Sequence, residues 1–154
     1  MNNTMTIDTE TFAMLIESQY ADMISAAEKI GADYAEWKPQ GKGRTILSQL
    51  QECAVRAHQV LGTLNGESAG GGPPSAEALA QYATFEDAIQ GCRDTASALA
   101  AKLRTLSPDD LQKTITNRFG EFSFARLIVG AYWNASYHEG QIVYIGSLLE
   151  GSGA

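Results

Sequence analysis

Histidine and cysteine are scarce in this sequence, with two of each among 154 residues. Two histidines cannot form a three-histidine metal site, so any bound metal would need other ligands as well. Cys53 and Cys92 both fall on apolar stripes of predicted helices. We therefore expect two buried free thiols that pack as small apolar side chains, although the residues alone leave a disulfide open.

Basic residues are also few. Eleven Lys and Arg stand against 18 Asp and Glu, which gives a formal net charge of −7. A nucleic-acid-binding surface needs clustered cations to neutralise phosphates, and only Lys38, Lys42 and Arg44 cluster here. The charge therefore argues against nucleic acids and against anionic membranes as partners.

Long apolar runs are missing too. The apolar run Leu127–Trp133 is far shorter than the about 18–20 residues that a membrane span requires. The residues Met1–Thr4 supply neither the basic nor the apolar region of a secretory signal. We therefore expect no membrane span, no secretory signal and a cytoplasmic location.

The sequence does contain the apolar periodicity of helices. Hydrophobic residues make up 44% of the chain, and its length suits one domain over residues 1–154 with its own core. Apolar residues recur at a helical period in four segments, and we expect helices at about 9–32, 45–64, 85–106 and 124–149. Helices of about 20 residues are about 30 Å long. Four amphipathic helices of matched length indicate an all-α, four-helix bundle.

The connections between these helices differ in length. Residues 65–74 read NGESAGGGPP, which ends the second helix decisively. So long a second connection permits a crossover in place of simple up-and-down order. Residues 76–82 favour a short helical turn, and residues 114–122 favour a short extended turn before the last helix.

The last helix is apolar on more than one face. A helix that is hydrophobic nearly all round is buried nearly all round, and a bundle of this size cannot cover every face of one helix. We therefore expect a homodimer formed through the helix at 124–149.

Three neighbouring positions on one stripe of the last helix are polar: Asn134, His138 and Gln141. A buried polar group without a partner loses about 1–3 kcal/mol. His138 could ligate zinc, nickel or iron, or it could be a core histidine hydrogen-bonded to Asn134, Gln141 or a tyrosine hydroxyl. The residues alone favour the core histidine.

Glu52, on the helix at 45–64, has two interpretations. Its carboxylate could ligate a metal or act as a base, or it could pair at the surface with Arg56, four residues later. Helical spacing favours the ion pair. The other histidine, His58, lies off the apolar stripe of this helix, and we expect it at the surface.

Several motifs together resemble the DinB-like family. They are Trp37-Lys38-Pro39, Gly43-Arg44-Thr45-Ile46 and Tyr137-His138-Glu139-Gly140-Gln141-Ile142. The resemblance implies a four-helix bundle of unusual connectivity, often a homodimer. Many members bind a divalent metal through one histidine on the second helix and a His-x3-His pair on the fourth. Characterised relatives include metal-dependent transferases that use low-molecular-weight thiols and a mycothiol-dependent isomerase.

The family's three metal-ligand positions fall on Glu52, Asn134 and His138, so only one keeps a histidine. A carboxylate can replace imidazole on zinc, whereas a neutral asparagine oxygen is a poor substitute. The resemblance also implies that Glu52 points inward to His138, where its charge would stabilise an imidazolium. We follow the resemblance here over the helical spacing.

These observations leave three functions open. The preferred one is a homodimer that is metal-free or binds metal weakly, in which a polar pocket around Glu52, Asn134, His138 and Gln141 binds a small molecule or only orders the core. The alternative is a transferase for a low-molecular-weight thiol, in which Glu52, Asn134 and His138 hold zinc or nickel. The third is a dimeric structural module with no small-molecule role.

Overall fold

A computed structural model describes residues 8–67 and 72–152. Four long helices dominate it: α1 (Thr9–Ile30), α2 (Ile46–Leu64), α4 (Phe85–Leu103) and α5 (Phe124–Ser152). The smaller elements are α3 (Ala76–Ala80), strands β1 (Thr114–Asn117) and β2 (Gly120–Ser123), and 3-10 turns at Ala32–Tyr34 and Asp110–Gln112. The predicted all-α four-helix bundle is confirmed.

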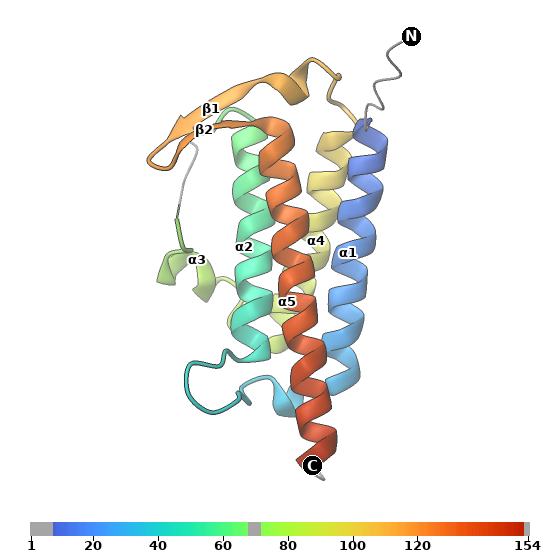
Figure 1. Cartoon of the computed structure of the whole chain (residues 1–154), viewed down its shortest axis with the longest axis vertical. Helices are drawn as coiled ribbons and strands as arrows, with labels where there is room; N and C mark the ends of the chain where they lie inside the picture. Colours follow the sequence, from blue (N-terminus) through green and yellow to red (C-terminus); the bar gives the residue numbers. More distant parts are fainter. Residues whose placement is uncertain (1–7, 68–71, 153–154) are drawn as a thin grey trace.

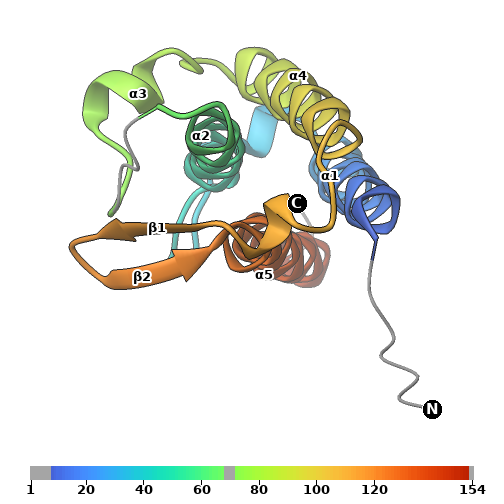
Figure 2. The same ribbon diagram turned by 90° about the horizontal axis from the view of Figure 1, so that it is seen from above.

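Each long helix packs against two others. α1 and α2 both contact α4 and α5, so α1 and α2 lie diagonally opposite, as Figure 2 shows. In Figure 1, α1 and α5 run downward while α2 and α4 run upward. The connection after α2 therefore returns to the lower end before α4 begins, which is the crossover that its length permitted.

The predicted helix starts are confirmed by side-chain caps. The Asp8 carboxylate accepts the Thr11 N–H at 2.7 Å, and the Thr45 hydroxyl accepts the Ser48 N–H at 3.0 Å. The Ser123 hydroxyl accepts the Arg126 N–H at 3.2 Å at the start of α5. These bonds satisfy N–H groups that have no partner within the helix.

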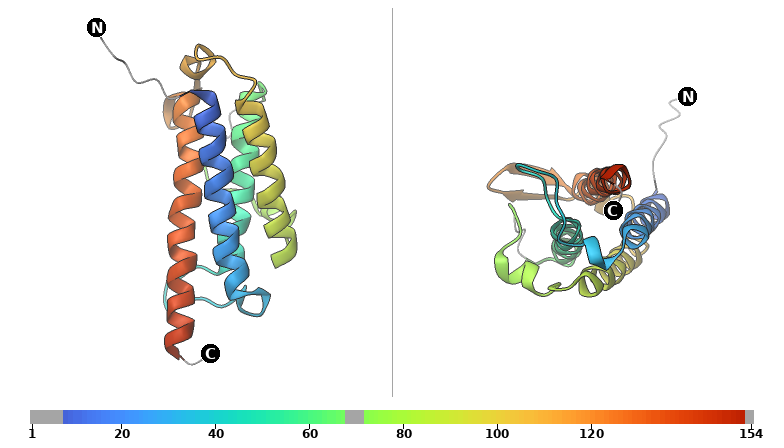
Figure 3. Two further views of the ribbon diagram at one scale, coloured as in Figure 1. Left: turned by 90° about the vertical axis from the view of Figure 1, so that its right-hand side faces the viewer. Right: turned by 90° about the horizontal axis from the view of Figure 1, so that it is seen from below.

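The helix ends differ from the prediction by two or three residues. α1 ends at Ile30 instead of residue 32 because Gly31 adopts a φ of 94°, in the left-handed region that terminates helices. α4 ends at Leu103 because Arg104–Leu106 form tighter turns. α5 continues through Gly151 to Ser152, since a single glycine in a helical pattern does not break it. In Figure 3, α5 extends beyond the other helices at its C-terminal end.

The extended turn expected before the last helix is a β-hairpin. β1 and β2 pair antiparallel, with Asn117 opposite Gly120. The Asn117 side chain accepts the Phe119 N–H at 2.8 Å, and Gly120 has a φ of 118° that favours glycine. The hairpin lies beside the upper end of the bundle and leads directly into α5 (Figure 1).

The core contains most of the expected apolar residues, and both cysteines lie in it as free thiols. The stripe on α5 required correction. Ile128, Ile142 and Leu149 are buried, whereas Gln141, expected on one stripe with Asn134 and His138, is only partly covered. The helix is rotated slightly from the predicted orientation because α1 and α2 cover it from two sides.

The outer face of α5 is exposed in the single chain, whereas the sequence favoured burial nearly all round. The exposed large side chains on it are Val129, Trp133, Tyr137, Val143 and Tyr144, each between 47% and 62% exposed. Among the described residues, no helix has the length and apolar character needed to cross a membrane.

Candidate polar centre between α2 and α5

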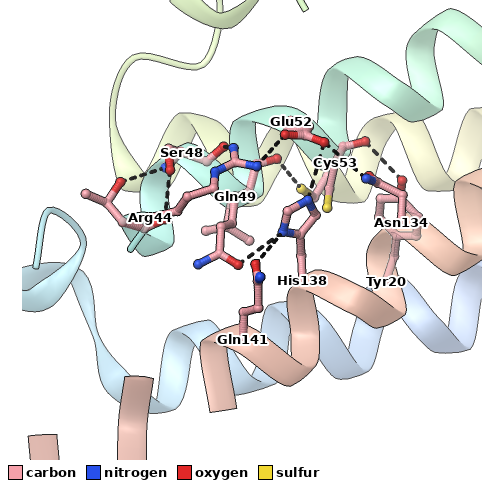
Figure 4. Close-up of polar contacts among 12 residues, drawn as sticks. Tyr20, Arg44, Ser48, Gln49, Glu52, Cys53, Asn134, His138 and Gln141 are labelled. Carbon is pink, nitrogen blue, oxygen red and sulfur yellow. Dashed lines mark hydrogen bonds and ion pairs between the residues drawn. The ribbon is translucent and has the colours of Figure 1, made fainter. Parts of the chain in front are cut away.

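Helices α2 and α5 bring Glu52, Asn134 and His138 together (Figure 4). The Asn134 Nδ2 donates to Glu52 Oε1 at 3.2 Å, and His138 Nε2 lies 3.4 Å from the same oxygen. Asn134 and His138 are one helical turn apart, so both reach the same carboxylate. The three residues predicted as metal ligands therefore meet at one point.

The other ring nitrogen of His138 faces two amides. Nδ1 lies 3.1 Å from Gln49 Oε1 and 3.2 Å from Gln141 Oε1. Every polar neighbour of the ring thus presents an oxygen that accepts a hydrogen bond. These oxygens can each accept a hydrogen bond from a ring N–H of His138.

Arg44 completes the centre from the loop before α2. Its Nη1 lies 2.5 Å from Glu52 Oε2, and its Nη2 donates to the Ser48 carbonyl at 2.9 Å. The hydrogen bond from His138, together with smaller contributions from Arg44 and Asn134, lowers the pKa of Glu52 to about 2 against the opposing effect of burial. Glu52 is therefore a carboxylate at neutral pH, held by three donors.

The structure decides between the two interpretations of Glu52. Its carboxylate faces His138, as the resemblance implied, and within the described residues its ion-pair partners are Arg44 and His138, not Arg56. Gln141 joins the network as expected, and His58 is exposed. The pairing with Arg56 was wrong because helical spacing alone cannot show which face of α2 meets α5.

Sequence reasoning missed two members of the centre. Gln49 is only 1% exposed and contacts the ring directly. Its position one turn before Glu52 on the same helix was the available signal. Arg44 was noted only as part of a basic cluster, and no local pattern connects a residue before the N-cap to a carboxylate two turns later.

The family resemblance implies a divalent metal held by Glu52, Asn134 and His138. The described residues contain no group of three His, Cys, Asp or Glu side chains placed to hold a metal ion. Glu52 and His138 are the only strong ligands here, and a guanidinium already lies on the outer oxygen of Glu52. A divalent cation beside Arg44 would meet like charge at close range. This donor set does not fit a divalent metal.

The residues of the polar centre are largely buried and packed together. Gln49, Asn134 and His138 are buried, while the Glu52 side chain is 21% exposed and Arg44 39% exposed. It therefore reaches solvent along the Glu52–Arg44 edge. Two hollows lie elsewhere, one of about 410 Å³ between α1 and α5 and one of about 290 Å³ between α1 and α4.

One buried atom of the centre lacks a partner. Asn134 Oδ1 makes no hydrogen bond within the described residues, because the carboxylate fixes the amide with its nitrogen toward Glu52. An unpaired buried acceptor costs about 1–3 kcal/mol. The network can therefore accept one more hydrogen bond, at Asn134 Oδ1.

Comparison with curated proteins finds no match to this chain. Comparison with family models finds one over residues 15–142, described as the DinB superfamily. The matched segment includes Glu52, Asn134 and His138 together with most of the four long helices. The chain therefore belongs to the DinB superfamily.

Proposed function

We propose that this DinB-superfamily protein works without a metal, as a homodimeric bundle that binds a small polar molecule at the Glu52–Arg44 edge. The observation that carries the proposal is the guanidinium of Arg44 on Glu52 Oε2. It places a permanent positive charge beside the carboxylate where family members would place a metal. Glu52 is then neutralised by the chain itself.

The chemistry of this edge defines the class of ligand. Arg44 offers planar N–H donors and Glu52 offers a carboxylate, while Asn134 Oδ1 is a buried acceptor without a partner behind this edge. A small molecule that carries both donor and acceptor groups complements this combination. Because Glu52 and Arg44 are only partly exposed, binding requires their side chains to shift toward solvent.

Metal content tests the metal-free part of this proposal. We expect mass spectrometry of protein purified without chelators, and then incubated with zinc, nickel or manganese, to find no stoichiometric metal. An Arg44→Gln variant should bind more metal than the native chain if the guanidinium is what excludes it. A stoichiometric metal in the native chain that is lost in His138→Ala would favour the thiol transferase instead and overturn the proposal.

Ligand screening tests the binding part. Small polar compounds that raise the melting temperature should lose this effect in Arg44→Gln. Arg93→Gln is the matched control, because Arg93 forms an ion pair of the same 2.5 Å length with Glu28 on a different face. If no compound binds the native chain, or if both variants lose binding equally, the centre is a structural network only.

The homodimer is proposed from the exposed face of α5. Five large apolar or aromatic side chains are clustered on one helix, each at least 47% exposed. Monomeric proteins rarely leave contiguous apolar patches of this kind uncovered. Sedimentation or light scattering at micromolar concentration should give twice the chain mass, and a monomer would refute the homodimer.

A further inference from the structure

The exposed face of α5 carries a regular seam, a row of residues spaced alternately by three and four positions. This spacing places residues along one side of a helix that meets another helix at a shallow angle. All of these residues are exposed except Ser136, which is half-buried. Figure 2 shows that one side of α5 faces away from the other three long helices. The seam consists of Arg126, Val129, Trp133, Ser136, Gly140, Val143, Ser147 and Glu150.

The seam is complementary to itself when it is read in reverse. Its midpoint is position 138, and residues equally distant from this point form pairs in an antiparallel arrangement. Arg126 then meets Glu150 of the partner subunit, and Trp133 meets Val143 of the partner subunit. At the centre, Ser136 meets Gly140 of the partner subunit, so two small residues permit close approach of the helices.

We propose that two copies of this chain pair through α5 in an antiparallel register with the two-fold axis at position 138. This inference rests on the proposed homodimer and specifies its geometry. The two copies bury the seam, including Trp133, and form two symmetric ion pairs between Arg126 and Glu150. Such an isologous contact closes as a dimer and does not extend into a fibre.

Charge selects this arrangement over a parallel one. Within the described residues, neither Arg126 nor Glu150 has an ion-pair partner in its own chain. At 1.5 Å per residue these two side chains lie about 36 Å apart along α5. Parallel helices would place Arg126 beside its own copy and Glu150 beside its own copy, which is repulsive at both ends.

The neighbouring hollow provides the remaining contact area. Stable interfaces bury about 800 Å² on each partner, which is more than one helix face supplies. The hollow of about 410 Å³ between α1 and α5 opens beside the seam, and Val143, Ser147 and Glu150 line one of its walls. Ile30 and Tyr34 line the opposite side, so the partner subunit also reaches apolar surface on α1 and the turn after it.

The pairing also brings the two polar centres close to the symmetry axis. His138 lies on the inner side of α5 at the midpoint of the seam and is only 1% exposed. The Tyr137 ring stacks on Trp133 at 5.4 Å and meets the His138 ring edge-on at 5.3 Å. The dimer therefore covers the aromatic layer that lies directly against the centre.

Charge reversal tests the register. Arg126→Glu and Glu150→Arg should each raise the dimer Kd about tenfold, because each creates two repulsive contacts by symmetry. The double variant should return the Kd to within about threefold of the native value, since the pairs are restored with opposite polarity. Arg118→Glu on the hairpin is the matched control and should leave the Kd unchanged.

Aromatic truncation tests the face. Trp133→Ala should abolish the dimer at micromolar concentration, while Phe119→Ala, which removes a hairpin aromatic of similar exposure (61% against 62%), should leave it intact. Both residues are exposed, so circular dichroism should show the native helix content in each variant.

The outcomes separate the proposals. A dimer that Trp133→Ala abolishes but that the double charge variant does not restore overturns the register and leaves the homodimer standing. A native chain that is monomeric at every concentration overturns both the register and the homodimer. Neither result bears on the metal-free centre, which metal content decides independently.

Discussion

The acid sensitivity of the centre gives the sharpest prediction. Glu52→Gln removes the carboxylate that His138, Arg44 and Asn134 share, while it keeps the shape of the side chain. The pKa of Glu52 falls from its usual 4.5 to about 2 in the folded chain, chiefly because His138 donates a hydrogen bond to it. A depressed pKa means that the folded state holds the charged form more strongly than the unfolded state does.

The sign and the magnitude follow from this shift. The stabilisation is fully present above pH 4.5 and is lost as the pH falls toward 2, because the unfolded chain takes up the proton first. The full shift corresponds to about 3 kcal/mol at about 1.4 kcal/mol per unit, and solvent screening reduces this to about 1–2 kcal/mol. The reduction applies because 21% of the Glu52 side chain is exposed.

Chemical denaturation at a series of pH values provides the assay. The difference in unfolding free energy between the native chain and Glu52→Gln should shrink by about 1 kcal/mol between about pH 6 and pH 3. Other acids with lowered pKa values, such as Asp8 and Glu17, are present in both proteins and cancel in the difference.

A control and a refuting result complete this test. Glu28→Gln removes a surface ion pair whose two side chains are each 47% exposed, and it should change the unfolding free energy by less than about 1 kcal/mol. If the Glu52→Gln difference stays constant from pH 6 to pH 3, the carboxylate is not held by the centre and our account of the network is wrong.

Three further predictions concern the scaffold. Thr84→Ala removes the hydroxyl of the capping box that Thr84 forms with Asp87, so the free energy of unfolding should fall by about 1 kcal/mol; no change in denaturant midpoint would contradict the cap. Burial raises the pKa of the Cys92 thiol to about 12, and Cys53 is buried as well. We therefore expect neither thiol to react with a thiol reagent at pH 8 until denaturant is added. Rapid labelling of the native chain would show instead that the core opens. Tyr20→Phe removes the hydroxyl that donates to the Cys53 carbonyl at 3.0 Å and should cost about 1 kcal/mol by thermal or chemical unfolding, whereas an unchanged stability would mean that this hydrogen bond contributes nothing net.

The sequence alone predicted several residues of the candidate site, for a physical reason. Asn134, His138 and Gln141 recur at helical spacing, so any helix there places them near one another. Their partners belong to another segment: the Gln49 contact with His138 spans 89 residues, and the Asn134 contact with Glu52 spans 82. No local pattern encodes which face of α2 meets α5, and only the motif resemblance predicted that Glu52 points inward to His138.

Local signals determined the helices and their order of appearance. Apolar periodicity and the capping residues Asp8, Thr45, Thr84 and Ser123 act over three or four residues, so they are legible without any tertiary contact. The tertiary structure decided the rest: the diagonal placement of α1 and α2, the rotation of α5, and the selection of Arg44 as the partner of Glu52. These features depend on which side chains contact one another after the helices pack. Desolvation and charge pairing act between residues that are far apart in the sequence, so no local pattern reveals them.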